Sequence, residues 1–155
     1  MEVEAYVLLR GIHNVLRWVV LVVAVAAIAG AWHGVFKKRA FEAGDRLRTV
    51  GYVAVMHLQL LLGLVLYAQS PIVRAAFQDF GAAMGNRTLR FFAVEHITMM
   101  ILAVIVVQVG SILAKRADED EKKHKRAAIC FTLGLVFILA GMPWAGPWMP
   151  TFSTP

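Results

Sequence analysis

Three histidines lie in or beside three different apolar segments of the sequence: His13, His57 and His96. The neutral imidazole nitrogen is a common axial ligand of haem iron, and it also binds non-haem Fe, Cu and Zn. Arg17 follows His13 by four residues, and Glu95 directly precedes His96. One intramembrane histidine alone favours an interhelical hydrogen bond, whereas three in separate segments favour a bound haem or metal ion. We therefore take these five residues as the candidate cofactor site, with the three histidines as candidate ligands.

The composition of the 155-residue chain predicts a membrane protein. Hydrophobic residues make up 59% of it, charged residues 17%, and the mean hydropathy is +0.66. A bilayer-spanning helix needs about 17–25 predominantly apolar residues. Four segments meet this requirement: Trp18–Phe36, Val50–Tyr67, Phe91–Ala114 and a fourth from Ala127 to about Trp144. They predict an all-α fold, in which residues 1–155 form one integral membrane four-helix bundle in the lipid bilayer.

The basic residues predict how the helices are oriented. Eleven of the 16 Lys and Arg residues fall in two connections, residues 37–48 and 115–126. Because an excess of Lys and Arg in short loops marks the cytoplasmic side, both termini are expected on the outer side, periplasmic in a bacterial inner membrane. These connections hold most of the net charge of +6, so no nucleic-acid partner is expected. The same argument predicts that His124 is a solvated loop residue. His33, beside Trp32 and near Lys37, is expected to be an interfacial residue rather than part of a second, inner site with His57.

The connections also carry local structural signals. Residues 70–85 read SPIVRAAFQDFGAAMG, with apolar residues spaced as on one face of a helix. This spacing predicts a short interfacial helix between the second and third membrane helices. Asp45 and Asn86 are predicted to be the N-cap residues of those two helices, because both types accept hydrogen bonds from the first backbone N–H groups.

The depth of each polar residue follows from a rise of 1.5 Å per helical residue. His13, Arg17, Glu95 and His96 then fall in the outer half of the membrane. Arg17 and Glu95 are predicted to form an ion pair, because a partner lowers the cost of a charge at that depth. Counting from the cytoplasmic ends favours His13 with His96 as the iron ligands, whereas counting from the outer ends favours His57 with His96. The sequence leaves this choice open.

Five stretches of the chain carry a resemblance: LLRGIHNVLRWVVLV, MHLQLLLGLVLY, LRFFAVEHITMMILAVIVVQVGSILAKRA, KHKRAAI and LAGMPW. Together they resemble a family of small four-helix membrane proteins of Bacteroidetes and relatives that are usually labelled cytochrome b. The resemblance implies a membrane-bound haem b protein in which the histidines matching His13, His57 and His96 recur with the residues matching Arg17 and Glu95. It implies no substrate.

Two functions follow as alternatives. The first is a b-type cytochrome that transfers electrons between a quinone and a membrane partner, either by itself or as a subunit of an oxidoreductase. The second is a non-haem subunit of a larger membrane complex or homo-oligomer, in which the histidines bind Fe, Cu or Zn or only connect the helices. An absorption spectrum of the purified protein distinguishes the two.

Overall fold

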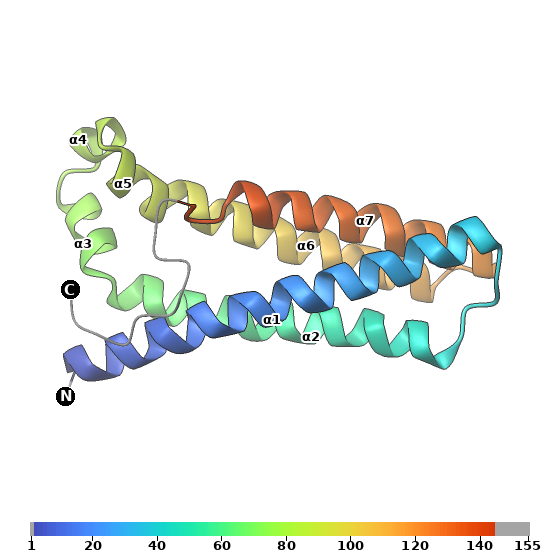
Figure 1. The fold of residues 1–155 in the computed structure, drawn as a ribbon. Coiled ribbons are helices and arrows are strands. Elements are labelled where there is room, and N and C mark those ends of the chain that lie inside the picture. Colours follow the sequence, from blue (N-terminus) through green and yellow to red (C-terminus); the bar gives the residue numbers. More distant parts are fainter. Residues whose placement is uncertain (1, 145–155) are drawn as a thin grey trace.

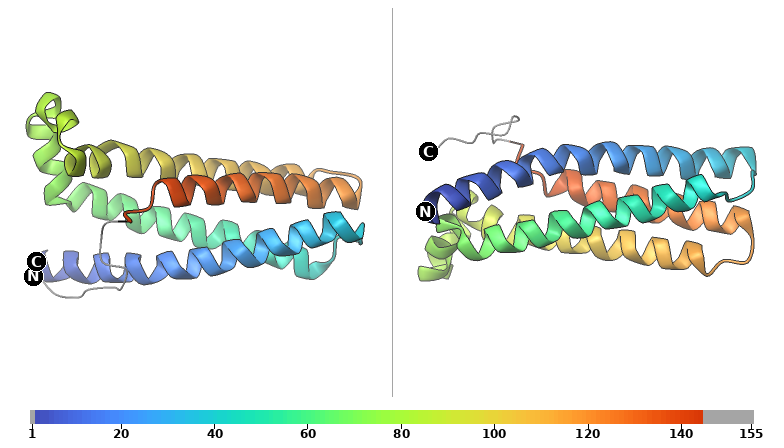
Figure 2. Two further views of the ribbon diagram at one scale, coloured as in Figure 1. Left: turned by 45° about the horizontal axis from the view of Figure 1, so that its top comes forward. Right: turned by 90° about the horizontal axis from the view of Figure 1, so that it is seen from below.

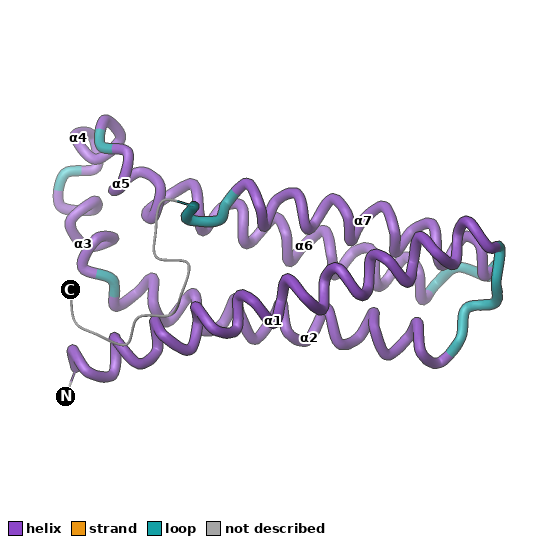
Figure 3. Tube along the Cα trace, viewed as in Figure 1, coloured by secondary structure: helices purple, strands orange, loops and turns teal. Residues whose placement is uncertain are grey.

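The computed structural model describes residues 2–144, and within this part of the chain every regular element is helical (Figure 3). Four helices are long: α1 (Glu2–Lys37), α2 (Ala43–Gln69), α6 (His96–Lys115) and α7 (Asp120–Ala140). Four short segments connect α2 to α6: α3 (Pro71–Gln78), α4 (Phe80–Gly85), α5 (Arg87–Arg90) and the π-helical turn η1 (Phe91–Glu95). The predicted interfacial helix is therefore divided into α3 and α4.

The four long helices lie along one another, each antiparallel to its neighbours (Figures 1 and 2). Helix α1 packs against α2 and α7, and α6 packs against the same two helices. The connections 38–42 and 116–119 lie at one end, which we call the basic end. The opposite end, where α1 begins and α3, α4 and α5 lie, we call the N-terminal end (Figure 1).

Three helical stretches are long and apolar enough to cross a membrane: Glu4–Lys37, Ala43–Gln69 and Arg87–Lys115. Their outward faces carry large apolar side chains, among them Val22 (69% exposed) and Leu61 (61% exposed). A helix that is apolar on its outer face as well as its inner face is typical of a lipid environment. The fourth predicted span is shorter than expected, because α7 ends at Ala140. A fourth crossing therefore stays a prediction.

Small residues are part of the core in which α1 and α7 pack. Ala24 on α1 and Ala128 on α7 are completely buried in the same apolar cluster, and small side chains let membrane helices approach closely. The Trp32 indole N–H donates a hydrogen bond to the Thr132 hydroxyl, 3.0 Å away, which joins the two helices nearer the basic end. These contacts hold the helices that position the site described below.

The turn between α1 and α2 is organised by a buried carboxylate. Asp45 is 4% exposed and accepts hydrogen bonds from the Arg39 and Arg48 guanidinium groups at 2.6 and 2.7 Å. The hydrogen bond from Arg39 to Asp45 raises the pKa of the Arg39 guanidinium. Helix α2 begins after Glu42, whose backbone N–H also donates to Asp45. The prediction that Asp45 is the N-cap is therefore wrong. Asp45 lies inside the first turn of α2, where its carboxylate accepts hydrogen bonds from these three groups.

His124 is buried, which corrects the prediction of a solvated loop residue. It is 0% exposed, and its ring lies 5.0 Å from that of Phe41, measured between centroids. The reason is that α7 begins at Asp120, so the basic segment is mostly helical and one of its faces turns inward. A Cβ atom at Gly34 would overlap the His124 ring, so glycine is required there for α1 to pass. His33, in contrast, is exposed.

Replacing Tyr52 with phenylalanine is expected to stabilise the protein by about 1 kcal/mol. Tyr52 is 0% exposed and packs edge-on against Phe131, and its buried hydroxyl has no hydrogen-bond partner among the described residues. Removing that hydroxyl removes its desolvation cost and keeps the ring. Thermal unfolding in detergent measures the effect. The matched control is Tyr67→Phe, which is expected to destabilise because the Tyr67 hydroxyl donates to the Ala93 carbonyl at 2.8 Å. A lower melting temperature for Tyr52→Phe would contradict the prediction.

Candidate functional site

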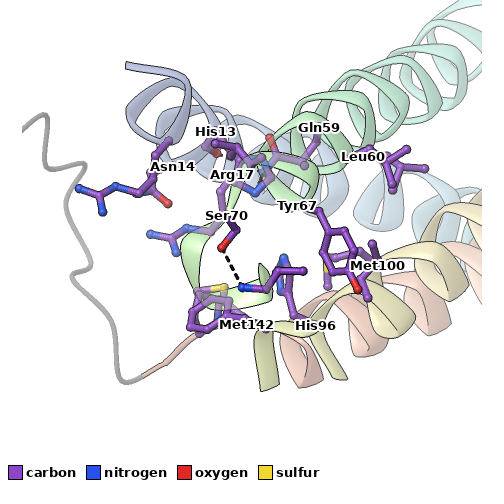
Figure 4. A pocket seen from close by; sticks show the side chains of 18 of the residues that line it. His13, Asn14, Arg17, Gln59, Leu60, Tyr67, Ser70, His96, Met100 and Met142 are labelled. Carbon is purple, nitrogen blue, oxygen red and sulfur yellow. Dashed lines mark hydrogen bonds between the residues drawn. The ribbon is translucent and has the colours of Figure 1, made fainter. Parts of the chain in front are cut away.

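A cavity of about 330 Å³ lies between the four long helices at the N-terminal end. Its walls are apolar toward the middle of the fold, where Met56, Leu60, Val104 and Ile138 line it. Polar side chains gather toward the end, and they come from α1, α2 and the first residue of α6 (Figure 4). Among the polar lining residues are His13, Arg17, Gln59, Tyr67 and His96.

His96 lines the cavity from α6, and its ring is held by a backbone carbonyl. Its Nδ1 atom lies 2.7 Å from the carbonyl oxygen of Gly141, at the end of α7. Because a carbonyl only accepts, Nδ1 donates the proton of this hydrogen bond, and in the neutral imidazole Nε2 then carries the lone pair. A Cβ atom at Gly141 would lie 2.6 Å from Cβ of Met99, so glycine lets the carbonyl come close to α6. This is the arrangement typical of a metal-ligating histidine, in which a carbonyl bound to one ring nitrogen orients the other.

His13 lines the same cavity from α1, on the opposite side from His96 (Figure 4). The Gln59 amide nitrogen lies 3.2 Å from Nε2 of His13 and 3.1 Å from its backbone carbonyl oxygen, so it donates to both. The second ring nitrogen, Nδ1, is buried without a hydrogen-bond partner in the described part of the chain. Because the Gln59 amide donates to Nε2, the proton of the neutral ring lies on Nδ1, and this buried N–H costs about 1–3 kcal/mol while it lacks an acceptor. Nε2 is open to another ligand only when the Gln59 amide moves away.

The structure does not bring His57 to the other two histidines. Its side chain is exposed on the outside of α2. Its Nδ1 atom forms a hydrogen bond with the carbonyl oxygen of Val53 in the same helix, 2.8 Å away. Met56 and Gln59, on either side of it in sequence, line the cavity. Because successive residues of an α-helix are rotated by about 100°, His57 points away from the cavity.

The predicted ion pair between Arg17 and Glu95 is not formed. Glu95 pairs with Arg90, whose Nε lies 2.6 Å from the carboxylate, and both side chains are partly exposed. The physical reason is the π-helical turn, in which residues five apart lie one above the other. Arg17 lines the cavity, with its guanidinium carbon 5.4 Å from the centre of the Trp18 ring. Glu95 therefore does not supply the counter-charge for the Arg17 guanidinium.

Three residues of the site were missed by the sequence argument: Gln59, Tyr67 and Gly141. Gln59 gave a usable signal, because an amide inside an apolar span needs a polar partner. Tyr67 and Gly141 gave none, since tyrosine is common at membrane interfaces and glycine is common at helix ends.

The comparisons with known proteins give no relative: no protein-family model, curated protein or solved structure matches this chain. The resemblance to the cytochrome b family therefore depends on the sequence stretches quoted above. The cavity and its lining residues carry the chemistry of the site.

Proposed function

We propose that this chain is a b-type haem-binding membrane protein that transfers electrons, with haem b held between His13 and His96. One observation carries the proposal: the imidazoles of His13 on α1 and His96 on α6 line the same cavity from opposite sides. These two histidines would hold a low-spin haem b, and bundle cores commonly hold such cofactors between facing helices.

The size of the cavity and the number of its ligands favour haem over a bare ion. A volume of about 330 Å³ is within the range of small-molecule sites. Among the described residues, no group of three or more His, Cys, Asp or Glu side chains could hold a metal ion. Zinc sites use at least three protein ligands, whereas a porphyrin supplies four nitrogens of its own. Two histidines are therefore a sufficient set for haem and a poor one for zinc.

The other lining residues support the same assignment. The apolar walls suit the faces of a porphyrin and keep water from it, whereas Arg17, at the polar side, suits a carboxylate such as a haem propionate. The haem iron supplies one-electron chemistry when bound. The protein's part is to orient His96 through the Gly141 carbonyl, to place His13 opposite and to exclude water.

The membrane arrangement belongs to the same proposal. The protein is a transmembrane four-helix bundle of the bacterial inner membrane, with α7 as the fourth span. The basic end faces the cytoplasm, so the termini and the haem lie on the periplasmic side. A quinone is the proposed small-molecule electron partner, and a further membrane protein subunit or a second copy of this chain is the proposed protein partner.

The alternative is a non-haem or purely structural role. It is favoured by the contacts that the histidines already make, because His13 binds Gln59 and His57 binds its own helix. Interhelical hydrogen bonds in membrane proteins average about 0.6 kcal/mol each. In this alternative the histidines connect helices, and the cavity binds no haem.

An absorption spectrum of the detergent-purified protein, titrated with haem b, tests the proposal. We expect saturation at one haem per chain and, after reduction, the resolved α and β bands of a low-spin haem with two histidine ligands. A protein that takes up no haem would overturn the proposal. Stoichiometric Zn, Cu or Fe in that haem-free protein would establish the non-haem alternative, and the lack of any metal would establish the structural one.

A further inference from the structure

The helix that carries His96 begins with an unusual turn. Residues Phe91–Glu95 form η1, and the backbone N–H of His96 donates to the carbonyl of Phe91, five residues earlier. A π-helical turn is rare and marks a local departure from the α-helical ladder, often beside a functional site. It holds one residue more than an α-helical turn, so it changes the direction of every side chain before it relative to those after it.

This change of direction separates two neighbouring side chains. Glu95 points to Arg90 at the partly exposed edge of the turn, whereas His96 lies in the cavity wall. A turn without the extra residue would rotate the two parts of the helix by about 100° relative to each other. The turn therefore sets the rotation of the segment before His96 relative to α6, which carries the cavity wall.

A hydroxyl from another helix holds this turn in place. Tyr67, in the last turns of α2, donates a hydrogen bond of 2.8 Å to the carbonyl of Ala93, the middle residue of η1. Helix carbonyls normally accept from the backbone, and a side-chain donor inserted there stabilises an interrupted ladder. Ala93 is 3% exposed and packs with Ala76 of α3 and Ala83 of α4. Contacts from α2, α3 and α4 thus meet at the middle of the turn.

Tyr67 also lines the cavity (Figure 4). Its ring is thus a wall of the site, while its hydroxyl fixes the turn that precedes His96. We infer that Tyr67 is a positioning residue: it sets the direction of His96 by holding η1 against α2. The ligand that His96 would bind rests on the proposed function, but the contact between Tyr67 and η1 does not.

The test compares Tyr67→Phe with wild type, first without haem. Hydrogen exchange of the amides of residues 93–98, followed by mass spectrometry or NMR, reports whether the turn is held. We expect exchange about fivefold faster in Tyr67→Phe, the change produced by losing one ordinary hydrogen bond. The matched control is Tyr52→Phe, a buried tyrosine of the same helix whose ring packs against Phe131 of α7, and it is expected to leave these amides unchanged.

Haem titration of the same variants shows whether the turn directs His96. We expect Tyr67→Phe to bind haem about fivefold more weakly and to show a high-spin fraction, while Tyr52→Phe keeps the wild-type spectrum. A purely structural tyrosine would change stability without changing the spin state.

The outcomes separate this inference from the proposed function. Unchanged exchange in Tyr67→Phe would overturn the inference, whether or not wild type binds haem. Faster exchange with an unchanged haem spectrum would also overturn it, because the turn would then not direct His96. If wild type binds no haem, the proposed function fails, and the NMR signals of the His96 ring decide instead: a change of its tautomer in Tyr67→Phe supports the inference, and no change overturns it.

Discussion

Replacing His96 with alanine is expected to abolish the low-spin haem spectrum and to weaken haem binding by at least about a hundredfold. His96 is the histidine whose tautomer is fixed by the Gly141 carbonyl, so its Nε2 lone pair is oriented before any ligand arrives. Alanine removes that ligand and leaves an apolar methyl group in the cavity wall. Haem titration followed by absorption spectroscopy, before and after reduction, measures the loss. His13→Ala is expected to give the same result, because the two rings lie on opposite sides of the cavity.

His57→Ala is the matched control, since it removes an imidazole of the same size from the outside of α2. We expect it to leave the spectrum and the affinity unchanged. The reverse pattern, with His57 essential and His13 dispensable, would show that the other ligand pair considered from the sequence is the right one.

The positions of the helices could be predicted from the sequence, but their rotation could not. Hydropathy placed Val50–Tyr67 inside α2 because an apolar stretch of that length has few other stable forms in a membrane. Within α2, however, both the inner and the outer face are apolar, so no polar face indicates which side turns inward. Counting residues along the helix therefore gave the depth of His57 in the membrane, but not the direction in which its side chain points.

The π-helical turn explains a second limit of the sequence argument. Glu95 and His96 were assigned to one site because they are adjacent, and Arg17 was assigned as the partner of Glu95 because of its depth. The extra residue in η1 changes the helical phase, and Arg90 then becomes the near cation. No simple spacing rule predicts such a turn, because Tyr67, from the preceding long helix, holds it in place.

Capping gave one confirmed and one wrong prediction, and the difference is physical. Asn86 is the N-cap of α5, where its side-chain oxygen accepts from the N–H groups of Thr88 and Leu89 at 3.0 and 3.1 Å. A neutral amide attracts guanidinium groups less strongly than a carboxylate does. The Asp45 carboxylate instead lies between two guanidinium groups, and these charge-assisted contacts fix it inside the first turn of α2.

The basic end holds the packing contact with the largest expected effect on stability. His124 is completely buried where α7 packs against α1, and its ring lies in the space that the missing side chain of Gly34 leaves open. Local sequence composition could not show this, because the neighbouring lysines and arginines indicate a solvated segment. The burial arises from a contact between residues that are far apart in the chain.

Gly34→Val is expected to destabilise the protein by about 1–3 kcal/mol, because the new side chain overlaps the His124 ring and a packed interior has no room for it. His124→Ala is expected to destabilise it as well, by leaving a cavity. The double variant should be more stable than the two separate losses predict, by about 0.5–3 kcal/mol, since valine occupies space that the ring has left.

Unfolding by denaturing detergent, followed by circular dichroism, gives the four free energies of the cycle. Gly51→Val is the matched control on α2, because a Cβ atom there meets nothing within 4 Å. Strict additivity in the cycle, or an equal loss of stability in Gly51→Val, would mean that the close approach of α1 to His124 does not hold this end of the fold together.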